Sequence, residues 1–265
     1  MDNQLQGVIL GGVVIVDIAT GQYSSLDLPT SSDQAYSIAG NISLSPDNAR
    51  LAYSITFAEK GEETSEIWTM RMDNLDKQLV YRMKGVINTL AWSPTGKQLT
   101  YSYQPGIHPP STNLSELWLL DSDGTSQRFI TSTHSVGGQR YGPTWSPDGR
   151  YVVFTQADDP ALFLSDWRGP GTNVYVADTV TGQFTRLSTF KGRSNEFPTW
   201  SPDGKFVAFV STILVGEPEM YNPGLVYVEV WVASVDGSQL YAVSGMARWA
   251  SPLAWLSSVP SGQEK

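Results

Sequence analysis

The sequence contains no cysteine, only two histidines, and fewer basic than acidic residues. Without cysteine the chain forms no disulfide, thiolate metal site or cysteine nucleophile, and either a reducing or an oxidising compartment suits it. The 17 Lys and Arg residues against 26 Asp and Glu residues give a formal net charge of -9, which opposes binding to the phosphate backbone of nucleic acids. We therefore expect no nucleic-acid partner.

Long hydrophobic runs are also missing. The apolar stretch over residues 7–18 is too short to span a bilayer, and no Lys or Arg precedes it, unlike in a signal peptide. We expect a chain that is not membrane-spanning as given, with any export signal or anchor lying outside it. Hydrophobic residues make up 40% of the chain, with 9 Trp and 12 Tyr, which favours a globular domain rich in strands.

A sequence repeat recurs roughly every 50 residues. Trp-Ser-Pro-Asp-Gly occupies residues 145–149 and 200–204, and related segments occupy 42–47, 90–95 and 253–257. Pro presets φ for a turn, Asp suits the next position and Gly supplies a left-handed residue, so these copies predict β-hairpins. A period of this length is typical of the four-stranded blade of a propeller.

The residues after each hairpin complete the expected blade. Apolar segments such as 151–154 and 206–209 predict second strands. Third strands carry an aromatic residue at a fixed place: Trp68, Trp118, Tyr175 and Trp231. A turn then leads to a fourth strand. The tryptophans that end the first strands are expected to pack between blades: Trp92, Trp145, Trp200 and Trp255.

The two ends of the chain carry complementary halves of the repeat. Residues 13–22 align at a constant offset with 174–183, whereas the segment near Trp255 supplies only a first strand. Pairing of these halves removes exposed sheet edges. We predict an all-β fold, a five-bladed β-propeller of four-stranded antiparallel blades whose ring is closed by pairing of the N- and C-terminal strands, with 1–265 as a single domain. A fragment of a six-bladed or larger propeller is the alternative.

Residues 145–154 and 200–209 resemble the TolB-type propeller repeat, in which Trp-Ser-Pro-Asp-Gly-Lys/Arg precedes a strand that ends in Phe. The resemblance covers nearly the whole chain. It implies a periplasmic or extracellular scaffold that binds a protein or peptide and has no cofactor. We expect five blades where TolB has six, no additional N-terminal domain, and no α/β-hydrolase segment like that of peptidases with the same repeat. TolB's own partners are therefore not carried over.

The two faces of such a propeller are expected to differ. The Ser-Pro-Asp-Gly hairpins project from one face, and the second-to-third connections project from the other, where they are expected to lengthen along the chain: 58–66, 104–116, 157–173 and 212–225. Long loops on a rigid scaffold commonly carry function. We predict that this second face binds the partner through residues before the first strands and in the loops: Asn88, Arg140, Tyr141, Trp167, Asn195, Glu196, Tyr221 and Trp249.

No catalytic or metal-binding residue is predicted. The sequence has no Gly-x-Ser-x-Gly elbow and no Gly-Lys phosphate loop, and His108 and His134 lack metal-ligand spacing. We expect a monomeric, non-catalytic scaffold. Two alternatives are kept, the gating propeller of a prolyl-oligopeptidase-like peptidase and a propeller glycosidase. In the latter, Glu196 would work with one of three loop carboxylates: Asp166, Glu217 or Glu219.

Overall fold

The computed structural model describes ten segments of the chain: residues 13–16, 23–26, 42–59, 62–105, 115–133, 142–156, 171–191, 193–215, 225–243 and 253–255. Within these segments every regular element is a β-strand, and every ladder is antiparallel. A search of the same residues for a helix long and apolar enough to cross a membrane finds none. The predicted all-β antiparallel propeller class is confirmed.

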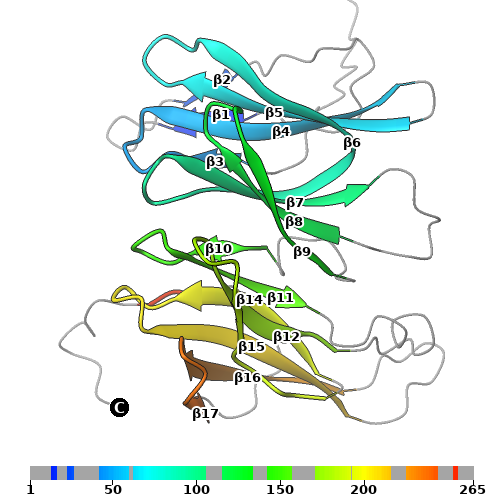
Figure 1. The fold of residues 1–265 in the computed structure, drawn as a ribbon, viewed down its shortest axis with the longest axis vertical. Coiled ribbons are helices and arrows are strands. Elements are labelled where there is room, and N and C mark those ends of the chain that lie inside the picture. The colour runs from blue at the N-terminus through cyan, green and yellow to red at the C-terminus, as the bar shows by residue number, and fades with distance from the viewer. Residues whose placement is uncertain are drawn as a thin grey trace, which may run out of the picture.

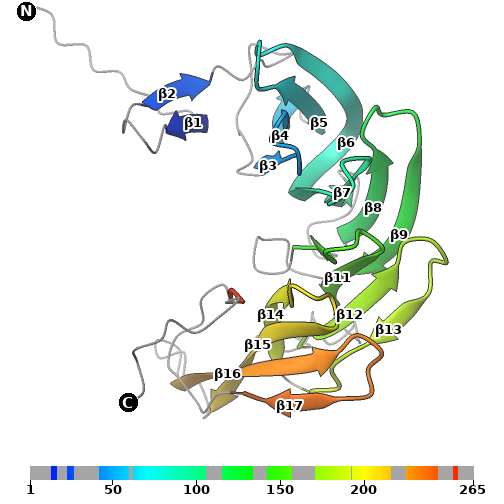
Figure 2. The same cartoon turned by 90° about the vertical axis from the view of Figure 1, so that its left-hand side faces the viewer.

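Four blades follow one another along an arc (Figures 1 and 2). Blade 1 contains β3 (Ile42–Leu44), β4 (Arg50–Glu59), β5 (Glu62–Arg71) and the first part of β6 (Lys77–Trp92). Blade 2 contains the rest of β6, β7 (Gln98–Pro105), β8 (Ser115–Asp121) and β9 (Gln127–Thr133). Blade 3 contains β10 (Thr144–Trp145), β11 (Tyr151–Gln156), β12 (Asn173–Asp178) and β13 (Phe184–Arg186). Blade 4 contains β14 (Ser194–Trp200), β15 (Phe206–Val215), β16 (Leu225–Ser234) and β17 (Leu240–Ala242).

Blades 3 and 4 are separate four-stranded sheets, as predicted, but blades 1 and 2 share strand β6 and form one seven-stranded sheet. β6 pairs with β5 up to Lys84 and with β7 from Gly85 onward. Gly85 has φ 117°, a conformation that residues with a side chain rarely adopt, so the strand changes sheets at this glycine. The chain therefore passes from the fourth strand of blade 1 to the first strand of blade 2 without an intervening loop.

One serine closes the hairpin between the first and second strands of each blade: Ser45, Ser93, Ser146 and Ser201. Its Oγ accepts the backbone N–H of the residue five positions later, at 2.8 to 3.1 Å. In three blades the hydroxyl also donates to an aspartate two positions later, at 2.5 or 2.6 Å. Gly149 and Gly204 hold the left-handed position, and Asn48 holds it in blade 1 with φ 58°. The predicted hairpins and their left-handed glycines are confirmed, whereas the serine hydrogen bonds were not predicted.

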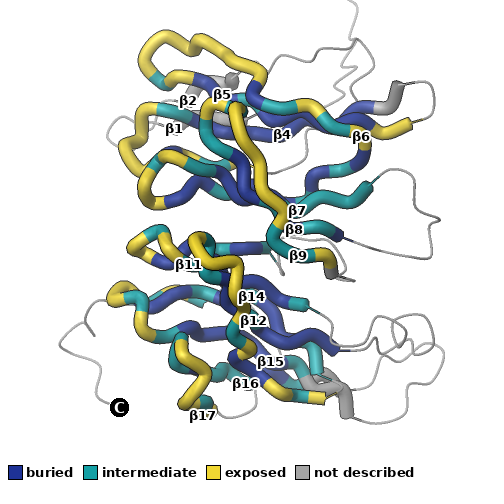
Figure 3. Tube along the Cα trace, in the orientation of Figure 1, coloured by how far each residue is buried: buried dark blue, intermediate teal, exposed yellow. Residues whose placement is uncertain are grey.

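The core lies between blades, and Figure 3 shows buried segments running through β4, β11, β14 and β15. Trp92, Trp145 and Trp200 are all less than 9% exposed, so their predicted packing role is confirmed. Three of the tryptophans donate an indole N–H to the carbonyl that precedes the corresponding residue of the previous repeat: Trp145 to Ala91 at 3.4 Å, Trp200 to Thr144 at 3.0 Å, and Trp255 to Thr199 at 3.3 Å. Trp255 therefore occupies a first-strand position.

The N-terminal hairpin is built like the second half of a blade. β1 (Val13–Val16) pairs with β2 (Tyr23–Leu26), and Val16 lies opposite Tyr23 as Ala177 lies opposite Phe184 in blade 3. The same offset that aligns the two sequences thus aligns the two ladders. Among the described residues β1 and β2 pair only with each other. The closure that joins them to the strand near Trp255, the count of five blades, and the single-domain organisation stay predictions.

The second-to-third connections differ from the expected series. In blade 1, β4 ends at Glu59 and β5 begins at Glu62, so most of the expected loop at 58–66 is strand. The later connections fall between Pro105 and Ser115, Gln156 and Asn173, and Val215 and Leu225, so the widest gap is in blade 3 and the lengths do not increase steadily. The expected range of blade 3 was also the widest of the four, and each observed gap is shorter than the range expected for it, because the paired strands extend past the apolar segments from which their ends were inferred.

Candidate functional site

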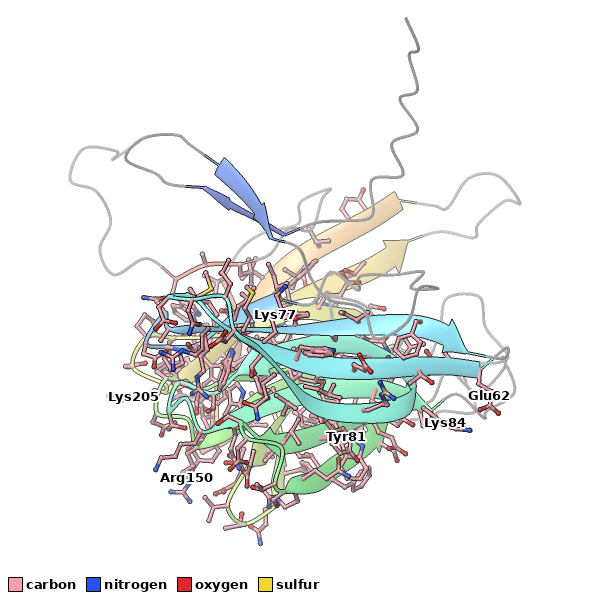
Figure 4. All side chains as sticks on the ribbon, turned by 90° about the horizontal axis from the view of Figure 1, so that it is seen from above. Glu62, Lys77, Tyr81, Lys84, Arg150 and Lys205 are labelled. Carbon is pink, nitrogen blue, oxygen red and sulfur yellow. The ribbon has the colours of Figure 1, made fainter. Side chains whose placement is uncertain are left out.

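We call the end of the blades with the serine-closed turns the hairpin end, and the end reached by Pro105, Gln156 and Val215 the loop end. Figure 4 shows Arg150 and Lys205 at the hairpin end, and Glu62 and Lys84 at the opposite, loop end. First strands of neighbouring blades contact one another, so they line the axis of the arc. The candidate residues Asn88, Asn195 and Glu196 lie on these first strands.

A β-bulge interrupts the first strand at the candidate positions in blades 2 and 4. In β6 the bulge falls between Ile87 and Thr89, so Asn88 is the extra residue. In β14 it falls between Glu196 and Thr199. Bulges re-aim side chains and are common beside functional sites. The ladder resumes on the loop side of each bulge, at residues 85–87 and 194–196, so each bulge shifts the register of its first strand part of the way along.

Backbone strain accompanies the second bulge. Phe197 has φ 54°, the left-handed region, although it carries a bulky side chain and precedes Pro198. Both features disfavour this conformation, because residues before proline prefer extended backbone and only small or polar residues tolerate positive φ. Strain of this kind persists where surrounding structure enforces it, often beside sites of function. Phe197 is next to Glu196, which the structure places in a buried position.

Asn195 joins two elements. Its backbone N–H donates to Thr172 Oγ1 at 2.9 Å, Thr172 Oγ1 donates to the Asn195 carbonyl at 2.9 Å, and its Nδ2 donates to the Thr172 carbonyl. The side chain is fully buried, and in the part of the chain that the structure describes its Oδ1 has no hydrogen-bond partner. Ser211, opposite it on β15, also has an unpartnered Oγ. Asn195 thus holds residue 172 against β14 while leaving an acceptor unused.

Asn88 carries the other unused amide atom. Its Nδ2 is buried and, among the residues described, has no acceptor. Most buried polar atoms in proteins are hydrogen-bonded, so an exception at a candidate site suggests a ligand position. The remaining candidates lie outside the described residues: Arg140, Tyr141, Trp167, Tyr221 and Trp249. Of the four carboxylates considered for a glycosidase, only Glu196 is described; Asp166, Glu217 and Glu219 are not.

Sequence reasoning missed a carboxylate that accompanies three of the third-strand tryptophans. Each indole N–H donates to the glutamate two residues earlier: Trp68 to Glu66 at 2.9 Å, Trp118 to Glu116 at 2.8 Å, and Trp231 to Glu229 at 3.1 Å. In blade 3 the aromatic residue is Tyr175, which has no indole N–H, and Asn173 replaces the glutamate. The pattern Glu-x-Trp was visible in the sequence at the same place in three repeats.

The three carboxylates have different surroundings. Glu66 is fully buried and accepts a hydrogen bond from Arg82 Nε at 2.7 Å, and Glu229 accepts one from Arg193 Nη1 at 2.7 Å. Glu116 has no ion pair among the described residues. Burial, followed by the negative charge of Glu116, raises the pKa of the neighbouring Tyr103 hydroxyl. Glu116 is therefore the one carboxylate of this set whose charge is not balanced by a paired arginine in the described chain.

Comparisons with known proteins agree with this architecture. The family model described as the TolB beta propeller domain matches residues 32–213. The Tol-Pal system protein TolB of Francisella tularensis subsp. holarctica is 28% identical over 156 residues, which cover 56% of this chain and 33% of that protein. The TolB of Nitratidesulfovibrio vulgaris is 33% identical over 100 residues, 38% of this chain and 20% of that protein. The chain thus matches a third or less of these curated relatives.

Solved structures share the fold. The putative TolB from Agrobacterium tumefaciens has a TM-score of 0.55 at 22% identity, covering 88% of this chain and 73% of that one. An oligogalacturonate lyase in complex with manganese has a TM-score of 0.59 at 13% identity, covering 88% and 59%. At these identities the likeness concerns the fold alone, whereas the family model spans more than half of the sequence. The chain belongs to the TolB beta propeller domain family.

Proposed function

We propose that this chain is a non-catalytic propeller scaffold that binds a protein or peptide at its loop end, outside the cytoplasm. The observation that carries the proposal is the family match over residues 32–213, together with relatives named for the Tol-Pal system. The chain matches only part of those relatives, so their activity and partners enter here as a proposal. A scaffold of this kind needs no cofactor, and we propose that it acts as a monomer.

The chemistry of the two ends supports the loop end as the binding surface. At the hairpin end, the serine hydroxyls, the aspartates and the turn amides satisfy one another. At the loop end, Asn88 and Asn195 keep unpartnered amide atoms beside two bulges. One unused donor and one unused acceptor suit a ligand that offers both, such as a peptide backbone. We propose that Arg140, Tyr141, Trp167, Glu196, Tyr221 and Trp249 complete this surface.

We propose a non-catalytic role because the sequence contains no Gly-x-Ser-x-Gly elbow, no Gly-Lys phosphate loop and no histidine pair with metal-ligand spacing. Propellers of the same fold include an oligogalacturonate lyase and an acylaminoacyl peptidase, so a lyase or hydrolase is the competing reading. Either reading needs an acid and a base held at reacting distance. Glu196 is the one buried carboxylate among the candidate residues described, and it makes the competing reading testable with a single variant.

The test has a binding arm and a catalytic arm. The partner is captured with the full chain from a cell-envelope fraction of the source organism and identified, and its affinity is then measured for purified variants. The loop-end variants Trp249→Ala and Glu196→Gln should weaken binding by about 10-fold or more, as expected for interface centres. The hairpin-end variant Lys205→Ser, in a groove of about 600 Å³ between blades 3 and 4, should bind as wild type does.

If Lys205→Ser weakens binding and the two loop-end variants do not, the interface lies at the hairpin end. In the catalytic arm, oligogalacturonate, aryl glycosides and peptide amides are incubated with the protein. Turnover that Glu196→Gln abolishes would replace the scaffold with an enzyme. Recovery of the protein in the cytoplasmic fraction of the source cells would contradict the proposed location.

A further inference from the structure

The Glu-x-Trp pairs of blades 1 and 4 hold an arginine each, and each arginine comes from a different place. In blade 1, Arg82 lies directly across the β5–β6 ladder from Glu66. In blade 4, Arg193 precedes β14 and reaches Glu229 on β16. The carboxylate thus takes an indole N–H and a guanidinium in both blades. A glutamate that accepts an indole N–H is thus an arginine-binding site, and in these two blades the arginine comes from the same chain.

Blade 2 has the same carboxylate and indole, but neither arginine. The residue across the β8–β9 ladder from Glu116, equivalent to Arg82, is Ser132. The ladder position equivalent to Arg193 is Gly85, which pairs with Pro105. In blade 2, therefore, neither of the two positions that carry an arginine in blades 1 and 4 does so. Trp118 keeps its place, since it packs edge-to-face on Phe129 with ring centroids 5.3 Å apart.

A groove of about 350 Å³ opens beside Glu116, between blades 1 and 2. Its lining is aromatic: Tyr81, Tyr101, Tyr103 and Trp118, with Met83, Pro105, Glu116 and Gln127. Hydrogen bonds hold the tyrosines, because Tyr101 Oη donates to Gln127 Oε1 at 3.1 Å and Gln127 Nε2 donates to Tyr81 Oη at 2.7 Å. Tyr81 and Lys84 lie along the same strand in Figure 4. The nearby ammonium of Lys84 pairs with Glu62 at 2.5 Å.

We infer that this groove binds the guanidinium group of an arginine side chain presented by another protein. A carboxylate oriented by an indole N–H can accept guanidinium N–H groups, and tyrosine and tryptophan faces attract the same planar cation. Arginine fits better than lysine, because its fork matches the carboxylate and its plane stacks on aromatic rings. In blades 1 and 4 the equivalent glutamates, Glu66 and Glu229, each bind an arginine of the same chain, which supports arginine as the ligand of Glu116. The inference rests on the proposed function in one respect: the arginine is assumed to belong to a partner protein.

The test uses the tripeptide acetyl-Gly-Arg-Gly-amide and the indole N–H resonance of Trp118, which reports directly on the Glu116 hydrogen bond. Titration of the whole chain should shift this resonance saturably. The peptides with citrulline or lysine in place of arginine should bind about 10-fold more weakly or not at all. Glu116→Gln, which keeps an acceptor for the indole, should weaken arginine binding by about 10-fold or more.

Two further variants control for general charge and for blockage. Glu63→Gln removes one negative charge from an exposed position in blade 1 and should bind the peptide as wild type does. Ser132→Arg rebuilds the arrangement of Arg82 opposite Glu66 and should abolish binding without lowering the melting temperature. An unresponsive Trp118 resonance in the wild-type chain, or equal binding by Glu116→Gln, would overturn the inference.

The outcome is separable from that of the proposed function. A responsive groove in a chain that captures no partner at the loop end would leave this inference standing and remove the proposed scaffold role. A partner that still binds Glu116→Gln and Ser132→Arg with unchanged affinity would show that its arginine does not use this groove.

Discussion

Serine and asparagine serve different purposes at the two ends of the blades. At the hairpin end, Ser146 is almost fully buried, yet its hydroxyl accepts the Tyr151 N–H and donates to Asp148. Near the loop end, buried side-chain atoms of Asn88, Asn195 and Ser211 have no partner in the part of the chain that the structure describes. The serine hydrogen bond to the backbone is repeated in every blade, although the buried indole N–H of Trp92, beside Ser93, also has no partner among the described residues. The unpartnered atoms near the loop end belong to side chains that differ from blade to blade.

The two ends differ in how far their hydrogen bonds depend on neighbouring parts of the fold. The hairpin network forms within six residues, so it can be copied from blade to blade without regard to the neighbours. The loop end is assembled from residues distant in sequence, such as Thr172 with Asn195 and Arg82 with Glu66, and each blade solves it differently. Because that end differs from blade to blade, we expect function to be located there.

The largest effect that we expect comes from the tryptophans of the first strands. Trp200 is 7% exposed, packs on Tyr151 with ring centroids 6.4 Å apart, and donates to the Thr144 carbonyl. Trp200→Ala should lower the free energy of unfolding by about 3–5 kcal/mol, because it leaves a cavity between blades and removes the indole hydrogen bond to the Thr144 carbonyl. Urea unfolding measures the loss. Val180→Ala, in the turn after β12 where the side chain is 75% exposed, should cost less than about 1 kcal/mol.

The hairpin serine should come second. Ser146→Ala removes the acceptor of the Tyr151 N–H and the donor to Asp148, and we expect a loss of about 1–3 kcal/mol because these groups are buried or half-buried. Ser122→Ala, in the turn between β8 and β9, is the matched control and should change stability by no more than about 0.5 kcal/mol. Equal effects of the two substitutions would contradict the view that the serine network holds the hairpin end together.

A smaller effect should appear in acid. Hydrogen bonds from Ser234, then from the Ser238 N–H and hydroxyl, lower the pKa of Asp236 to about 2. Its pKa is about 4 in the unfolded chain, so its contribution to stability is complete above pH 4 and is lost as the pH falls toward 2. Asp236→Asn should therefore melt below wild type at pH 6, with the difference shrinking to nothing near pH 2. A difference that does not change with pH would exclude the ionised carboxylate as its source.

The sequence predicted the parts of the fold that depend on local chemistry. The repeated turn residues predicted the hairpins, and the alignment of 13–22 with 174–183 predicted the pairing of β1 with β2 in the register of blade 3. It did not predict that β6 runs through two blades, because an alternating pattern does not mark where one sheet ends and another begins. Gly85 was the signal, and its positive φ is a property of the folded chain.

The candidate site was predicted less well, for a related reason. The glutamates of the Glu-x-Trp pairs are visible in sequence, but Arg82 and Arg193 reach them from a fourth strand and from the segment before a first strand. No fixed spacing joins the three groups, so only the structure distinguishes Glu116 from Glu66 and Glu229. Of the eight residues predicted to bind, Asn88, Asn195 and Glu196 are described, and the assignment of all eight to the binding surface stays a prediction.

The smallest effect on stability should come from Asn88, at the bulge of β6. Its buried Nδ2 has no acceptor among the described residues, so Asn88→Ala removes a desolvated donor and breaks no hydrogen bond of that atom. We expect the free energy of unfolding to change by no more than about 0.5 kcal/mol, or to rise. Asn173→Ala is the matched control, because the Asn173 side chain accepts from Ser188 Oγ at 2.9 Å and from the Phe190 N–H at 3.0 Å, and donates to the Phe190 carbonyl at 3.1 Å.

We expect Asn173→Ala to cost about 2–3 kcal/mol, since it removes three hydrogen bonds of a buried side chain. Thermal and urea unfolding of the two variants side by side measure the contrast. If Asn88→Ala is as damaging as Asn173→Ala, the Asn88 amide stabilises the fold and the case for a ligand position at this bulge is lost. If Asn88→Ala is neutral for folding and weakens the captured partner, an amide that the fold does not use is being used by the ligand.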